Sequence, residues 1–202
     1  MLSLVADPLR QGRGARLAHA FADHRAGSVA IEFSMIGLAC FGLIIETMQA
    51  GMYFYTSAEL NNATAKAMRQ VMTGAVTQQG LTATQFRTNV LCPYLPSVMP
   101  CSSVVVNMQS VNEDVSPNGF YKFVNAAQTS VVMPAMDNNK TSFCSGGSGT
   151  VIYAQVYYAM PVFSMAWKLY GTSTFGGSTV HLVPAAAVFR NEPFQATQSS
   201  TC

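Results

Sequence analysis

A long apolar stretch from Ser28 to Tyr55 constrains this chain more than any other feature. It is interrupted by two carboxylates, Glu32 and Glu46, and by a few small polar residues. Its length suits one helix crossing the hydrocarbon core of a bilayer, which takes roughly 20 residues. The run from Phe33 to Ile45 carries no charge, so a helix formed from it has no side suited to water. The stretch predicts a membrane-spanning helix, and the alternative is the buried core helix of a soluble protein.

The charges that precede this stretch predict its orientation. Residues 1–27 contain Arg10, Arg13, Arg16 and Arg25, whereas no arginine occurs between Ser28 and Met68. By the positive-inside rule the amino end of the helix then stays in the cytoplasm. Residues 1–27 lack the continuous apolar core of an ordinary secretory signal, so they are interpreted as a cytoplasmic leader.

Composition supports a membrane protein or an assembly subunit. Of the 202 residues, 50% are hydrophobic and 10% are charged, whereas about a quarter of the residues of a soluble domain are charged. Outside residues 1–27, seven basic residues balance seven acidic ones. No basic surface for nucleic acid is therefore expected.

The helix is predicted to continue beyond the membrane, over Val29–Thr73, with Gly74 as its stop. At 1.5 Å per residue it would be roughly 68 Å long, about twice the thickness of the hydrocarbon core. Its outer half must therefore dock on the chain's own domain or on neighbouring copies. One side of that half is apolar or small at helical spacing: Leu60, Ala63, Thr64, Ala67, Met68 and Val71. The other side is polar: Glu59, Asn62, Lys66, Arg69 and Thr73.

The cysteines outside the apolar stretch indicate an oxidising compartment. They are Cys92, Cys101, Cys144 and Cys202, an even set that predicts two disulfides, with reduced buried thiols as the alternative. A Cys92–Cys101 bridge would close a proline-rich loop that has little else to hold it. That would leave Cys144 for Cys202, although the sequence leaves the connectivity open. Their spacing does not match a metal site.

The carboxy-terminal part reads as a small antiparallel sheet with short helices. A capping-box pattern at Thr82–Gln85 predicts a short helix, and Pro161–Tyr170 predicts another that begins at its proline. Four strands are expected, at Ser103–Ser110, Thr129–Met133, Thr150–Met160 and Thr179–Phe189. Pro184 suits an edge strand or a break in the last of them. The predicted fold class is α+β: a long helix followed by this disulfide-containing sheet domain.

No catalytic apparatus is recognisable in the sequence. There is no Gly-x-Ser-x-Gly elbow, and the acidic residues of residues 75–202 are few. The loop Ser145–Gly149 lacks the Lys-Ser/Thr ending of a P-loop, so it is interpreted as a turn. Trp167 and the methionines are interpreted as core residues. The chain is therefore expected to be neither an enzyme nor a holder of metals or cofactors.

The heptapeptide Gly27-Ser-Val-Ala-Ile-Glu-Phe33 resembles the processing site of type IV pilin-like proteins. The wider pattern resembles the TadE family of tight-adherence (Tad) pilus systems. The resemblance includes Glu46 within the apolar stretch, the alanine-rich helix that follows it, and a late strand ending in Val188-Phe-Arg-Asn-Glu-Pro193. The match is most specific over Gly27–Thr73 and loose beyond it. The chain is far longer than the major pilin of Tad systems, so it resembles a minor subunit.

The resemblance implies a site at the amino end of the helix. A prepilin peptidase would cut between Gly27 and Ser28, and the new amine of Ser28 would pair with Glu32 of an adjacent subunit during assembly. Glu46 needs a polar partner that the sequence does not identify. An apolar bundle strongly disfavours an unpaired carboxylate, whereas an amine at the same depth compensates it and sets the register between subunits.

The implied organisation has three parts: a cleaved cytoplasmic leader at 1–27, a transmembrane and extended amphipathic helix at 28–74, and a periplasmic α+β domain at 75–202. The expected location is the bacterial inner membrane, with entry into a pilus left open. The expected partners are the peptidase, other pilin-like subunits and the assembly platform. The alternative is an uncleaved single-pass envelope protein whose outer domain binds a surface or supports a secretion complex.

Overall fold

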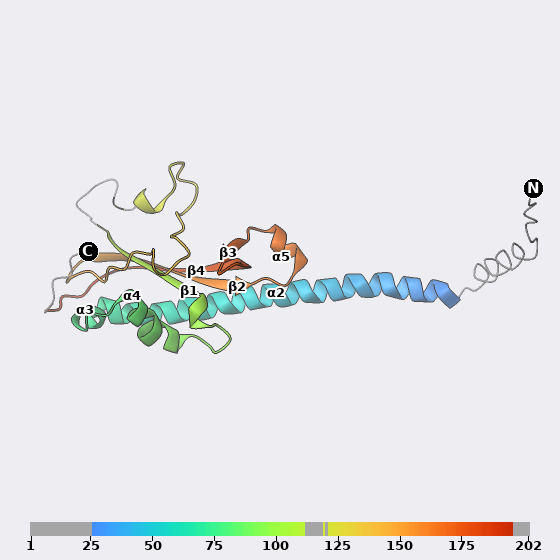
Figure 1. Ribbon diagram of the computed structural model, residues 1–202, viewed down its shortest axis with the longest axis horizontal. Helices are drawn as coiled ribbons and strands as arrows, with labels where there is room; N and C mark the ends of the chain where they lie inside the picture. The colour runs from blue at the N-terminus through green and yellow to red at the C-terminus, as the bar shows by residue number, and fades with distance from the viewer. Residues whose placement is uncertain (1–25, 112–118, 120, 196–202) are drawn as a thin grey trace, which may run out of the picture. The chain divides into compact units, whose positions relative to one another are not determined.

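The computed structural model describes residues 26–111, 119 and 121–195. Most of the predicted leader, and Cys202, lie outside these residues. The chain divides after Thr47 into two compact units, which are described separately. The fold is α+β, as predicted, with a long apolar helix and a four-stranded antiparallel sheet (Figure 1).

The long helix α2 spans Ala26–Met72, 47 residues without interruption. This confirms the predicted helix, which was placed at Val29–Thr73. The helix ends where expected, because Gly74 adopts φ +80° and its amide donates to the carbonyl of Val71 over 2.9 Å. Glycine enters this left-handed conformation without the steric cost of a Cβ.

Short helical segments follow α2. Helices α3 (Ala75–Gln78) and α4 (Ala83–Gln85) precede a π-helix at Phe86–Leu91, and 3₁₀ turns lie at Cys92–Tyr94 and Cys101–Ser103. The predicted capping box is confirmed: the Gln85 amide donates to the Thr82 hydroxyl, and the Thr82 amide donates to the Gln85 side chain. The π-helix was not predicted.

The predicted local disulfide is also confirmed. Cys92 and Cys101 are bonded, with their Cα atoms 5.7 Å apart, and the bridge joins the two 3₁₀ turns across the proline-rich loop. Cys144 is disulfide-bonded as well, and its predicted partner, Cys202, lies outside the described residues. Cys40 is a free, exposed thiol on α2.

The sheet has the strand order β1-β2-β4-β3. Its strands are β1 (Val104–Val111), β2 (Val151–Pro161), β3 (Ser173–Phe175) and β4 (Ser178–Arg190). The central strand β2 pairs with β1 through Val106 opposite Val156, and with β4 through Ala185 opposite the same valine. Three of the four predicted strands are thereby confirmed as β1, β2 and β4.

The predicted strand at Thr129–Met133 is wrong. Only one isolated bridge forms there, between Val124 and Val131. The side-chain oxygen of Asn125 accepts hydrogen bonds from the amides of Thr129 and Ser130, which closes a tight turn. That turn holds the backbone in a shape that a sheet ladder cannot use.

The helix predicted at Pro161–Tyr170 is shorter than expected. Helix α5 spans Met165–Leu169, because the Ser164 hydroxyl accepts from the Trp167 amide and caps the helix there. Pro161 instead ends β2. The hairpin β3–β4 was not predicted, although its two-glycine turn is a recognisable signal: Gly176 and Gly177 both adopt positive φ, as a tight hairpin requires.

Pro184 causes no break in β4. It lies opposite Tyr157 of β2, while β3 pairs only with the first three residues of β4, Ser178–Val180. Within the described residues, no strand pairs with the other side of β4 at Pro184. The prediction of an edge position is therefore correct at this residue, although β4 is not the last strand of the sheet.

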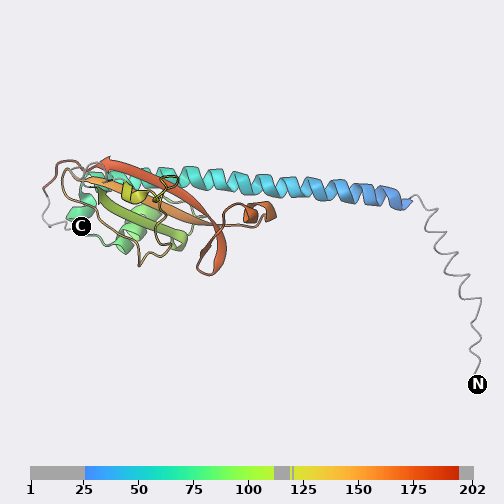
Figure 2. The ribbon, with the colours of Figure 1, turned by 90° about the horizontal axis from the view of Figure 1, so that it is seen from above.

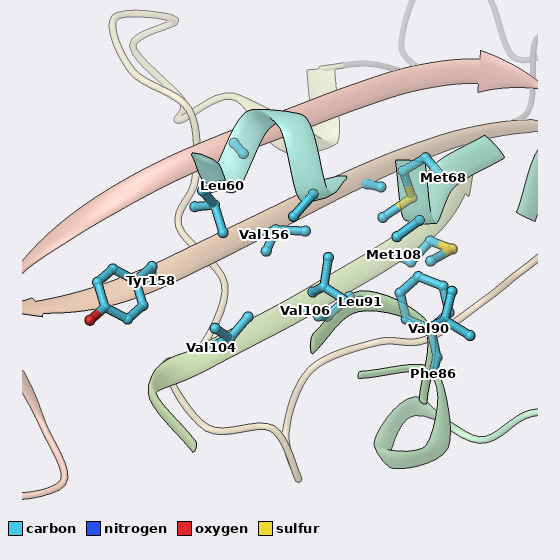
Figure 3. Packing of buried hydrophobic residues seen from close by; sticks show 14 of the residues in the cluster. Leu60, Met68, Phe86, Val90, Leu91, Val104, Val106, Met108, Val156 and Tyr158 are labelled. Atoms are coloured by element: carbon cyan, nitrogen blue, oxygen red, sulfur yellow. The ribbon is translucent and has the colours of Figure 1, made fainter. Parts of the chain in front are cut away.

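The main core lies between one face of the sheet and the carboxy-terminal part of α2 (Figure 3). The six apolar or small residues predicted on the inner side of the helix are all buried: Leu60, Ala63, Thr64, Ala67, Met68 and Val71. They pack with alternate residues of the strands, such as Val106 and Val156, and with Phe86 and Leu91 of the π-helix. The outer half of α2 thus docks on the chain's own sheet.

The opposite face of the sheet is covered by the segment after β1. Phe123 packs against Tyr153 with ring centroids 4.4 Å apart, and Asn107 donates to Gln155 within the covered face. Burial raises the pKa of the Tyr157 phenol, with a smaller contribution from Tyr153. β2 is therefore buried on both sides, which explains its almost continuous apolar sequence.

The end of α2 offers a test of this packing. A Cβ built on Gly74 would clash with the ring of Phe194, in a backbone conformation at φ +80°. We expect Gly74→Ala to destabilise the domain by more than the roughly 1–2 kcal/mol of left-handed strain alone, because the ring must also move. Urea unfolding of the detergent-solubilised chain, followed by far-ultraviolet circular dichroism, measures the change.

Gly149→Ala is the matched control. Gly149 has a similar φ of +74° but has no atom within 4 Å of a built Cβ, so it isolates the strain from the contact. Equal losses of stability in the two variants would contradict the role given to Phe194.

Candidate functional site

The amino-terminal part of α2 is an unburied apolar surface. No residue of 29–48 is buried, and this stretch has about the 20 residues that cross a bilayer. Large side chains such as Phe33 and Leu38 are exposed. Within the described residues, α2 is the one helix long and apolar enough to cross a membrane. A signal sequence meets the same criterion.

The site residues predicted for processing and assembly all belong to α2. Gly27 and Ser28 belong to the first turn of α2. Glu32 is exposed and Glu46 is half-buried. Cleavage at Gly27, and pairing of either carboxylate with another subunit, remain predictions. Among the residues that the structure describes, no group of three or more His, Cys, Asp or Glu side chains lies together as a metal site would require.

Gln49 marks the point at which α2 passes from this unburied surface to its packed half. Its side chain is fully buried. Its Oε1 accepts from the Phe163 amide over 3.1 Å, and its Nε2 donates to the Pro161 carbonyl over 3.4 Å. One amide side chain therefore ties the segment after β2 to the helix. Gln49 was not predicted as a site residue, because a glutamine inside an apolar stretch carries no distinctive pattern.

An aromatic cluster lies one turn further along α2. The ring of Tyr53 is 5.4 Å from Trp167 of α5 and 5.4 Å from His181 of β4, and the last two are 5.3 Å apart. Trp167 remains partly exposed, and Met165 is 83% exposed. The interpretation of Trp167 and the methionines as core is therefore wrong for Met165, and also for the exposed Met35, Met48, Met52 and Met133. It holds for Met108 and Met160, which are buried.

The glycine-rich loop at Ser145–Gly149 is held by its neighbours. Asn191 donates to the carbonyls of Ser145 and Gly147, and the Arg190 side chain donates to the Gly149 carbonyl. The Glu192 amide donates to the carbonyl of Met72 at the end of α2. The chain from Arg190 to Glu192 thus joins the loop to the helix end.

The open side of β4 and the adjacent face of α2 enclose an apolar recess. It has a volume of about 250 Å³ and is lined by Ala65, Met68, Arg69, Met72, Ala187, Val188 and Phe189. Beyond Val180, no described strand covers this side of β4. The outer edge of β1, at the opposite end of the sheet, is protected, because the Asn138 side chain donates to the Val104 carbonyl and accepts from the Val106 amide. An unpaired strand side next to an apolar recess is a surface suited to another chain.

Comparison of the chain with protein-family models, with curated proteins and with solved structures finds no match. The candidate site is therefore interpreted from its own residues.

The role of Gln49 can be tested directly. Gln49→Leu removes the acceptor of the Phe163 amide. Because an unsatisfied buried donor costs about 1–3 kcal/mol of stability, we expect this substitution to loosen the segment 161–171. Hydrogen exchange followed by mass spectrometry should show faster exchange across that segment. Gln79→Leu, at an exposed glutamine after α3, is the control and should leave exchange unchanged. Unaltered exchange in Gln49→Leu would refute the proposed tie.

Proposed function

We propose that this chain is a membrane-anchored, TadE-like minor subunit that acts in the assembly of a Tad or type IV-type pilus. The observation that carries the proposal is the division of α2. Its first half is an unburied apolar helix that bears a carboxylate four residues after Ser28, and its second half is docked on a sheet domain. Pilin-like subunits need these two properties together.

The apolar half supports anchorage and assembly in the same way. In the membrane, its exposed side chains face lipid, and in an assembly they face the helices of other subunits. Glu32 is costly in either setting unless a positive group compensates it. An amine created at Ser28 of an adjacent subunit has the required charge and depth, and the pairing would fix the axial register between copies.

The domain supports contacts that distinguish this subunit. The recess beside β4 lies on α2 and the sheet at once, so it offers a partner both apolar side chains and unpaired strand backbone. The disulfide at Cys92–Cys101 suits an oxidising periplasm. We place the chain in the inner membrane with its amino end in the cytoplasm and its domain in the periplasm, where the partners would be pilin-like subunits and the assembly platform.

Processing provides the first test. Coexpression with a prepilin peptidase should yield a mature chain that begins at Ser28, measured as intact mass. Gly27→Leu should abolish the cut, because a side chain at this position blocks the close backbone approach that glycine allows. Gly42→Leu is the matched control, since Gly42 lies in the same apolar helix with open space around it.

Two results of this test contradict the proposal. A wild-type chain that keeps residues 1–27 in the presence of active peptidase would favour the uncleaved envelope protein. Normal processing of Gly27→Leu would show that the cut does not depend on this glycine.

Assembly provides the second test. Glu32→Gln keeps the shape of the side chain and removes its charge, so we expect normal cleavage but a loss of assembly of more than tenfold. Removing one member of a buried ion pair typically costs about 3–5 kcal/mol. Copurification of subunits and counts of surface fibres measure the effect. Glu59→Gln, a carboxylate on the docked half of α2, is the control. Wild-type fibre numbers in Glu32→Gln would exclude the pairing.

A further inference from the structure

The segment around α5 presents an apolar surface to its surroundings. Met165 and Leu169 are 83% and 82% exposed, Tyr170 is 74% exposed and Phe163 is 49% exposed. Met165 and Leu169 are one helical turn apart and so lie on the same side of α5. Trp167 points the other way, onto Tyr53 and His181. The surface formed by Phe163, Met165, Leu169 and Tyr170 is called the α5 surface below.

The α5 surface is fixed at a defined height along α2. Both views of the domain show α5 beside the helix, at the end of the sheet where β2 finishes (Figures 1 and 2). The Gln49 side chain accepts a hydrogen bond from the Phe163 amide over 3.1 Å, and the Tyr53 and Trp167 rings pack together with their centroids 5.4 Å apart. These contacts attach α5 to the first turns of the packed half of α2.

The rise per residue of α2 gives the distance between the unburied stretch and the point where α5 is attached. Tyr53 follows Met48, the last residue of the unburied stretch 29–48, by about 8 Å at 1.5 Å per residue. The polar layer on each side of a bilayer is roughly 5–8 Å thick, since a core of about 30 Å lies within a total of about 40–45 Å. If residues 29–48 cross the core, Tyr53 and α5 lie at the level of the lipid headgroups.

We propose that the α5 surface inserts into the headgroup layer of the bilayer that α2 crosses, and so holds the domain against the membrane. The proposal rests on the membrane anchorage proposed above. Its chemistry fits that layer: Tyr and Trp rings favour the boundary between hydrocarbon and water. The apolar side chains of Met165 and Leu169 reach the acyl boundary, as those of interfacial helices do. Lys168, exposed between them, presents its ammonium group to lipid phosphates.

This contact gives the domain a second attachment beside its helix. While α5 is in the headgroup layer, leaving the membrane requires the withdrawal of the α5 surface as well as of α2. The α5 surface is then covered by lipid in the anchored subunit and becomes exposed when the subunit leaves the bilayer.

Fluorescence quenching in vesicles tests the proposal with the full chain. The chain has one tryptophan, Trp167, so the native protein carries its own reporter. Two further variants move the reporter to exposed positions: Leu169→Trp and Met133→Trp, each combined with Trp167→Phe. Met133 is exposed on the segment that covers the opposite face of the sheet, and it serves as the matched control. Each protein is reconstituted into phosphatidylcholine and phosphatidylglycerol vesicles that contain lipids with a nitroxide near the headgroup.

We expect the nitroxide lipids to quench Trp167 in the native chain, and to quench the Leu169 reporter several-fold more than the Met133 reporter. Aqueous iodide should show the reverse order. Equal quenching of the two moved reporters, or protection of Leu169 that depends on the ratio of protein to lipid, would overturn the proposal. The latter result would assign the α5 surface to a second copy of the chain.

An alkaline carbonate wash separates this proposal from the one on which it rests. Retention of the chain in the vesicles without quenching of Trp167 or of the Leu169 reporter would overturn the α5 contact alone. Release of the chain by the wash would overturn the membrane anchorage, and the α5 contact with it.

Discussion

The packing of α2 against the sheet is the interaction on which the domain depends. The buried side of the helix presents the small side chains of Ala63 and Ala67 between the larger Leu60 and Val71. Small residues bring the helix backbone close to the sheet, and the larger ones fill the space between the strands. The sheet contributes Val106, Val156 and their neighbours to the same cluster. Without this helix, one face of a four-stranded sheet would expose its apolar residues to water.

The burial of α2 changes along its length, and Gln49 lies where the change occurs. Over residues 29–48 the side chains of α2 are unburied and mostly apolar, whereas beyond Gln49 one side of the helix belongs to the domain core. A polar side chain at such a position would be costly if its hydrogen-bonding groups were empty. Those of Gln49 are used by Phe163 and Pro161, so the polar residue fixes the segment that leads into α5.

The outer edges of the sheet along β1 and β4 differ in how their backbone groups are covered. Asn138 supplies β1 with hydrogen bonds that a further strand would otherwise provide, and this blocks edge pairing there. Among the described strands, none pairs with β4 on its outer edge beyond Val180, and an apolar recess adjoins it. The two edges therefore differ: β1 is protected against pairing with another strand, whereas the described part of β4 beyond Val180 is open to it.

The local signals in the sequence were reliable where the residues that interact lie close together along the chain. The helix end at Gly74, the capping box at Thr82–Gln85 and the disulfide Cys92–Cys101 were all predicted and are present. Predictions failed where a side chain competes with regular structure. Asn125 turns the segment that β-branched residues had marked as a strand, and Ser164 caps α5, which begins at Met165 and not at Pro161.

By itself, the sequence determined the long helix, the buried side of its carboxy-terminal half, and the α+β class. These follow from the periodicity and length of apolar residues along the chain. Only the tertiary structure decided which surface covers the buried side of the helix, which edge of the sheet stays open, and where α5 lies. Gln49 and Trp167 show the physical reason. Their roles come from partners more than 100 residues away in the sequence, Phe163 for Gln49 and Tyr53 for Trp167, and no local pattern encodes a contact across that separation.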